Sequence, residues 1–210
     1  MRHLIRLDKP QKLVDNEEAW TEAFLNSSKT RPNNTQYAHK DIKNELGRIS
    51  HYKCFYSEVK FANLSDAQVD HYIEVSEDRT KAFDWSNLYL SHKDSNLGKP
   101  SNKTLPNASC LDPFTDQDSE IERNLDFEDE IMIGKTEKGL NTIQKYNLNK
   151  PIYNALRTKE LKKFTKITEA IAYHGLVLDE NLKETLRRYA NPDQPFSLMF
   201  KKLLTKHKLL

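Results

Sequence analysis

The sequence contains very little cysteine and no long apolar run. Only Cys54 and Cys110 are present in 210 residues, too few for the disulfide framework of a small secreted protein. No stretch approaches the roughly 18 to 20 apolar residues that cross a bilayer. The opening MRHLIRLDKPQK also lacks the apolar segment of a signal peptide. These absences predict a cytoplasmic protein.

The composition is that of a folded protein with an uneven charge distribution. Hydrophobic residues make up 37% and aromatic residues 10% of the chain, which suits a globular domain with a modest extension. Residues 135–210 carry 16 Lys and Arg against 7 Asp and Glu, whereas residues 1–134 carry 17 against 24. A basic C-terminal half suits a phosphate-binding surface, and solvated faces of amphipathic helices explain the same charges.

Hydrophobic periodicity and turn residues predict an α+β fold, a small strand-strand-helix unit placed between helices. The predicted helices cover residues 10–27, 35–50, 91–99, 137–149, 151–174, 179–190 and 195–207. The predicted strands cover 52–61, 68–75 and 83–90, with a small hairpin at 125–134. We divide the chain into an N-terminal helical segment (1–50), a core (51–100), and a loop, hairpin and helical region (101–210) that we expect to pack compactly with the core.

Three polar residues of the central unit are compatible with phosphodiester chemistry. Hydrolysis needs a base that activates water, and a cation that neutralises charge on the phosphate and the leaving oxygen. Oxygen ligands such as those of Asp70 and Asn96 suit Mg²⁺. In a strand, Asp70 and His71 point to opposite faces unless the strand bends or ends there. Each residue alone also has an ordinary explanation as a surface, turn or capping residue.

Together these residues resemble the motif of the HNH endonucleases, the ββα-metal nucleases. The resemblance covers residues 54–99 and includes Asp70-His71, Asn87 in SNLYL and Asn96 in SNLGK. It implies that His71 is the general base and that Asp70 and Asn96 bind one Mg²⁺ or Mn²⁺. It also implies that Asn87 orients the base and its loop, and that Lys99 contacts a phosphate.

Many HNH nucleases brace this fold with two zinc knuckles, whose positions are degraded in this sequence. The first pair reads Cys54 and Ser57, and the second reads His92 and Ser95. Structural zinc takes four Cys or His ligands, so we expect no structural zinc here. A third ligand from His51 is the alternative. The aromatic residues of this region could fill the space by packing: Tyr52, Phe55, Tyr56 and Phe61.

Over most of its length the chain is similar to the HNH proteins of Septu and retron-associated antiphage systems. The matching segments include KCFYSE, DHYIEV, AFDWSNLYLSHKDSN and GLNTIQKYNLNKPIYNALR. This similarity implies a bacterial defence nuclease with an ABC-type ATPase subunit (PtuA-like) as partner, in some systems beside a retron reverse transcriptase and its msDNA. The substrate class is nucleic acid, with DNA favoured over RNA. The alternative is a catalytically decayed adaptor that binds nucleic acid or bridges subunits.

The C-terminal helices raise a separate question. Their apolar segment PFSLMFKKLL (195–204) and their positive charge predict that residues 137–210 dock the ATPase. The competing interpretation is that these helices enclose the nuclease unit in one core. Residues 157–166 carry five basic residues against one Glu. This segment contacts nucleic acid or the ATPase, or is a solvated helix face.

Overall fold

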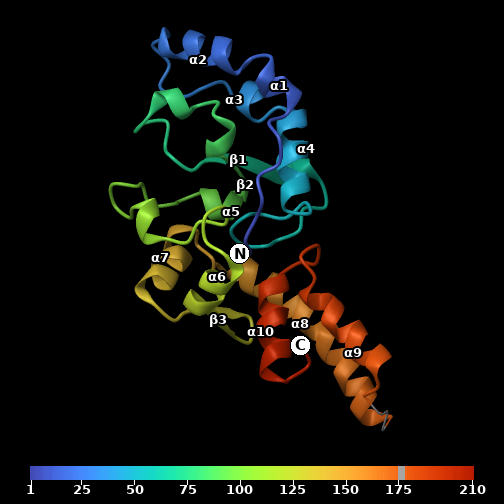
Figure 1. Cartoon of the computed structure of the whole chain (residues 1–210). Helices are drawn as coiled ribbons and strands as arrows, with labels where there is room; N and C mark the ends of the chain where they lie inside the picture. The colour runs from blue at the N-terminus through green and yellow to red at the C-terminus, as the bar shows by residue number, and fades with distance from the viewer. Residues whose placement is uncertain (175–177) are drawn as a thin grey trace.

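A computed structural model describes residues 1–174 and 178–210 of the chain. Figure 1 shows the N-terminal helices at one end and the β1–β2 unit in the middle. The β3–β4 hairpin and the C-terminal helices lie at the other end. The predicted α+β class, with a small strand-strand-helix unit between helices, is confirmed. No helix in the described ranges has the length and apolar character needed to cross a membrane.

The N-terminal region forms four short helices where two longer ones were predicted. The prediction of single helices over 10–27 and 35–50 is wrong, because each is interrupted by a polar residue that bonds the backbone. Asn16 donates from its side chain to the Lys12 carbonyl at 2.9 Å, and His39 caps the later helix by accepting from the Asp41 N–H at 3.3 Å. The four helices are α1 (Gln11–Val14), α2 (Glu17–Leu25), α3 (Asn34–Tyr37) and α4 (Lys40–Ile49).

The central unit is an antiparallel hairpin followed by one helical turn. β1 (Ala67–His71) pairs with β2 (Leu88–His92), so that Asp70 lies opposite Tyr89 and His71 opposite Leu88. α5 (Lys93–Asn96) is shorter than the helix predicted over 91–99, because the chain is already extended at Leu97. Gly98 follows with a φ of +74°, a conformation that glycine adopts without strain.

The segment 52–61 is a compact turn, and the prediction of a strand there is wrong. A single isolated bridge joins Lys53 and Lys60. Between them, the Cys54 N–H donates to the Val59 carbonyl at 2.9 Å, and the Glu58 N–H donates back to the Cys54 carbonyl at 3.1 Å. The Phe55 N–H then donates to the Leu90 carbonyl on β2 at 2.9 Å, which fixes the turn against the hairpin.

The rest of the chain contains the predicted small hairpin and helices, plus one helix that the sequence patterns did not predict. That helix, α6 (Asp118–Asn124), leads directly into the first hairpin strand. The remaining elements are β3 (Leu125–Glu128), β4 (Ile131–Gly134), α7 (Glu137–Lys145), α8 (Pro151–Tyr173), α9 (Glu180–Arg187) and α10 (Ser197–Lys206). Short 3-10 helices cover Leu64–Asp66, Arg79–Lys81, Trp85–Asn87, Asn107–Ser109 and Arg188–Ala190.

The apolar segment of α10 belongs to the interior. Leu198 packs in the larger hydrophobic cluster with the central unit, and Phe200 lies in a second cluster with Phe164 of α8. Leu198, Phe200 and Leu204 are all fully buried. The apolar content of 195–204 therefore covers the protein's own core. Its use as an exposed docking patch is ruled out, and the enclosing interpretation holds for this segment.

Candidate active site

Four of the predicted site residues line one cavity beside the β1–β2 hairpin. The cavity has a volume of about 400 Å³. The predicted residues that line it are Asp70, His71, Asn96 and Lys99. Asp70 and His71 are neighbours in sequence and still share the cavity, because β1 ends at His71 and the strand alternation ends with it.

Asp70 is a buried carboxylate with three hydrogen bonds. The Lys99 ammonium donates to Oδ1 at 2.8 Å and to Oδ2 at 2.6 Å. The Tyr56 hydroxyl donates to Oδ2 at 3.0 Å. Burial, followed by the charge of Asp70, raises the pKa of Tyr56, so this hydroxyl keeps its proton and remains a donor. The carboxylate is thereby held in a single orientation at the cavity wall.

His71 is held at one ring nitrogen, and the other has no hydrogen-bond partner within residues 1–174 and 178–210. Its Nε2 lies 2.9 Å from the Ala82 carbonyl oxygen. A carbonyl can only accept, so Nε2 carries the proton and Nδ1 keeps its lone pair. The ring also packs against Tyr37, with centroids 4.7 Å apart. Burial lowers the pKa of His71 below its ordinary value, although the Ala82 hydrogen bond and Asp70 act in the opposite direction.

Asn87 lies outside the cavity lining and ties together the loop between the strands. Its Oδ1 accepts from the Ile73 N–H at 2.6 Å, and its Nδ2 donates to the carbonyls of Ile73 at 3.0 Å and Lys81 at 2.9 Å. Lys81 immediately precedes Ala82, whose carbonyl holds the His71 ring. Asn87 thus fixes the backbone that orients the candidate base, which makes it a positioning residue.

The cavity is lined by oxygen-bearing side chains of the kind that hard divalent cations bind. Asn96 Nδ2 donates to the side-chain oxygen of Gln68 at 3.0 Å. The other terminal atom of the Asn96 amide is therefore its oxygen, Oδ1. Asp70 supplies carboxylate oxygens, and Mg²⁺ commonly binds through one or two protein ligands while keeping waters and substrate phosphates. A cation, the Lys99 ammonium, already lies against Asp70. The described residues contain no cluster of three or more His, Cys, Asp and Glu suited to a metal.

Two of the four knuckle positions bond to a hydroxyl that comes from α8, and the other two adjoin them. The Tyr153 hydroxyl lies 2.7 Å from Ser95 Oγ and 3.2 Å from His92 Nδ1. Cys54 Sγ accepts from the Ser57 N–H at 3.4 Å and lies 3.9 Å from Ser95 Oγ. A chain of hydrogen bonds therefore links the turn, the hairpin and α8. Of the aromatic residues expected to fill this space, Phe61 does stack on His92, at 6.2 Å between centroids.

The sequence did not predict a place at the candidate site for three residues. Tyr56 was expected only to fill space, yet it bonds Asp70. Tyr37 and Arg31 line the cavity from the segment around α3, far from the motif in sequence. A positive charge such as that of Arg31 is typical of a phosphate-binding residue. The sequence alone does not show that the 30–37 segment lies beside β1.

Comparison with known proteins finds a similarity to a Septu protein. The Septu protein PtuB from Bacillus thuringiensis is 27% identical over 150 residues, which cover 71% of this chain and 55% of that protein. The chain thus spans about half the length of the curated relative that it matches. No protein-family model matches the chain.

Proposed function

We propose that the chain is a metal-dependent HNH endonuclease that hydrolyses phosphodiester bonds in bacterial antiphage defence. The observation that carries the proposal is the shared cavity, in which the Asp70 carboxylate lies beside an imidazole whose Nδ1 is free. The similarity to a Septu protein supports the defence role. On that basis the partner is an ABC-type ATPase subunit that controls cleavage in the cytoplasm, in some systems with a retron.

His71 acts as the general base in this proposal. The Ala82 carbonyl holds the Nε2 proton, so Nδ1 takes the proton of the attacking water. The lowered pKa keeps the imidazole neutral, and so able to accept a proton, at physiological pH. Asn87 holds the loop that carries Ala82, which keeps the ring in this orientation during the reaction.

Asp70 and Asn96 are the residues that would hold the divalent cation. When bound, Mg²⁺ or Mn²⁺ would neutralise charge on the scissile phosphate and on the leaving oxygen. Tyr56 keeps Asp70 oriented through its hydrogen bond to Oδ2. Lys99 is the cation that Asp70 holds in the absence of substrate, and its ammonium is free to contact a phosphate once it leaves the carboxylate.

The ion pair between Lys99 and Asp70 favours a second candidate function. It satisfies Asp70 without any metal, as expected of a catalytically decayed fold that has become an adaptor between nucleic acid and other subunits. The two functions differ in whether the chain itself cleaves nucleic acid and in whether phage protection requires His71.

The experiment is a cleavage assay with the purified full chain, alone and with its co-expressed ATPase subunit. The substrates are supercoiled plasmid, linear duplex DNA and total RNA, each with Mg²⁺ or with EDTA. We expect Mg²⁺-dependent cleavage that falls by about 10²- to 10⁴-fold in His71→Ala, as is typical for loss of a general base. His51→Ala is the matched control, because His51 is exposed and the proposed reaction does not use it.

Cleavage that persists in His71→Ala would refute the assignment of the base. Full phage protection by His71→Ala cells would favour the adaptor. Cleavage of the RNA pool but not of either DNA would keep the nuclease and change its substrate class.

A further inference from the structure

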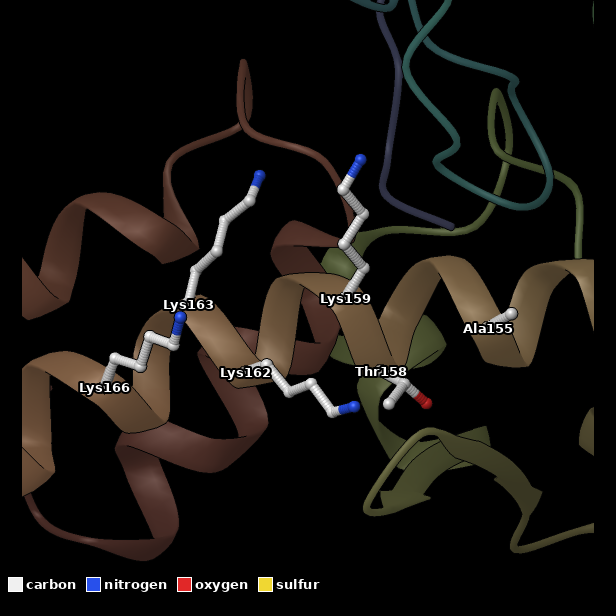
Figure 2. A pocket seen from close by; sticks show the side chains of 6 residues that line it. All are labelled: Ala155, Thr158, Lys159, Lys162, Lys163 and Lys166. Carbon is white, nitrogen blue, oxygen red and sulfur yellow. The ribbon is translucent and has the colours of Figure 1, made fainter.

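One face of α8 is covered by lysine side chains. Four residues form it, and we call them the lysine face: Lys159, Lys162, Lys163 and Lys166. Their spacing of three and four residues places them on the same side of the helix. All four are exposed, whereas Tyr153, Arg157 and Phe164 on the opposite side are buried. Figure 2 shows the four side chains along the helix, with Lys159 and Lys163 extending to the same side.

Most of this charge has no ion-pair partner among the residues that the structure describes. Lys163 forms an ion pair with Glu160, with 2.7 Å between Nζ and Oε1. Across residues 1–174 and 178–210, no carboxylate lies within 4.0 Å of the ammonium groups of Lys159, Lys162 or Lys166. Like charges three and four residues apart destabilise a helix. The arrangement therefore lowers the stability of the helix, and a bound anion would remove this repulsion.

The surroundings of the lysine face suit phosphates better than a protein partner. The hollow beside it has a volume of about 670 Å³ and is otherwise lined only by Ala155 and Thr158. Protein interfaces are depleted in lysine and depend on buried aromatic or arginine anchors, and this hollow offers none. From Lys159 to Lys166 the helix rises roughly 10 Å, which matches about three phosphates of one nucleic-acid strand.

The same helix connects the lysine face to the candidate active site. Tyr153 lies near the start of α8, where its hydroxyl bonds Ser95 and His92 of the central unit. A contact made at the lysine face is therefore held in fixed relation to the β1–β2 hairpin. This is the requirement for a surface that anchors a polymer while one of its bonds is cleaved.

We propose that the lysine face binds the phosphate backbone of the nucleic-acid substrate, outside the cavity and without sequence preference. The proposal rests on the proposed nuclease function and extends it to the positioning of substrate. Lysine ammonium groups act as point charges on phosphates and read no base edges. Binding should therefore depend strongly on salt and little on sequence.

The test is fluorescence anisotropy of the full chain with a labelled 30-base-pair duplex, in EDTA so that cleavage does not interfere. The variant is Lys159→Gln/Lys162→Gln/Lys166→Gln. The matched control is Lys40→Gln/Lys103→Gln/Lys208→Gln, which removes the same charge from exposed lysines in three separate segments. We expect Kd to rise about tenfold or more at 0.1 M salt in the first variant. The slope of log K against log salt should fall by roughly 2 to 3, since each lost phosphate contact removes about 0.9.

Equal binding by the two variants, or wild-type Kd in the first, would overturn the proposal. So would unchanged nucleic-acid binding combined with loss of the ATPase subunit from co-purification, which would make the face a protein-docking surface. Single-stranded DNA and RNA probes of equal length distinguish the nucleic acid that is held. Weakened binding in a protein whose wild type cleaves nothing would leave the lysine face standing and refute the nuclease function. Normal cleavage by the wild type, together with unchanged binding by the lysine variant, would support the nuclease function and refute the role of the lysine face.

Discussion

The Lys99 ammonium lies 2.8 Å from Asp70 Oδ1 and 2.6 Å from Asp70 Oδ2, and so contacts both oxygens of the carboxylate that is proposed to bind metal. Both side chains are buried, at 9% and 7% exposure. We expect a divalent cation at Asp70 to displace the ammonium, so that metal binding and the Lys99 contact compete for the same carboxylate.

This competition predicts the behaviour of Lys99→Gln. Without metal, the variant should lose about 3 kcal/mol of unfolding free energy, because Asp70 is left as an unpaired buried charge. Added Mn²⁺ should stabilise the variant more than the wild type, since no ammonium has to be displaced. Urea denaturation of both proteins, with and without Mn²⁺, measures the effect. Lys103→Gln is the exposed control, and an equal response of Lys99→Gln and wild type to Mn²⁺ would disprove the competition.

The lowered pKa of His71 predicts the pH dependence of activity and stability. The neutral imidazole is the active form, so cleavage should rise with pH along an acid limb whose midpoint lies below 6.5. The unfolded chain binds this proton more readily than the folded chain does. The contribution of His71 to stability is thus complete above the unfolded pKa and is lost as pH falls through the folded one. A midpoint above 6.5 for kcat/KM would contradict the burial of the ring.

The hydroxyl of Tyr153 predicts how the knuckle positions respond to substitution. In Tyr153→Phe, Ser95 and His92 lose their common partner in a buried site, which should cost about 1 to 3 kcal/mol of unfolding free energy. Denaturant titration measures the loss. Tyr173→Phe, a hydroxyl deletion at an 87% exposed position of the same helix, should change the stability by far less.

The same site predicts that zinc binding can be introduced. The wild type should purify without stoichiometric zinc, because Cys54 and His92 are the only two of the four positions with suitable ligands. Ser57→Cys/Ser95→Cys/Tyr153→Leu supplies a Cys₃His set and removes the hydroxyl between the positions. Elemental analysis should then find stoichiometric zinc in the variant. Zinc in the wild type, with unfolding on chelation, would reverse the assignment.

The buried face of α10 predicts that this helix is essential for folding. Phe200 is fully buried in the second hydrophobic cluster. Phe200→Ala should therefore cost about 3 to 5 kcal/mol of unfolding free energy. Lys206→Ala, on the exposed side of the same helix, should have little effect. A folded and stable Phe200→Ala protein would mean that α10 is dispensable for the core.

Local patterns predicted the central hairpin because its residues obey short-range rules. The strand predicted from QVDHYIEV (68–75) overlaps β1, but the strand predicted over 83–90 overlaps β2 only from Leu88, because Trp85–Asn87 form a 3-10 helix. The breaks at Asn16 and His39 depend on side-chain bonds to the backbone that compete with a continuous helix. Periodicity does not register that competition, so two helices were predicted where four exist.

The environment of the candidate site could not be predicted in the same way. Motif spacing brought Asp70, His71, Asn96 and Lys99 together as a set, and all four line the cavity. The Tyr153 hydroxyl reaches Ser95 across 58 residues of sequence. Contacts of that separation depend on how whole helices pack, and a single sequence does not reveal this.

The hydrogen bonds of Glu58 depend on residues that are translated much later. This buried carboxylate accepts from Lys53 Nζ at 3.0 Å, from Ser197 Oγ at 2.6 Å and from the Leu198 N–H at 3.1 Å. Two of these donors leave the ribosome some 140 residues after Glu58 itself. A nascent chain that already contains the whole β1–β2–α5 unit still lacks them. The hydrogen bonds of Glu58 are therefore complete only after Ser197 and Leu198 have been translated.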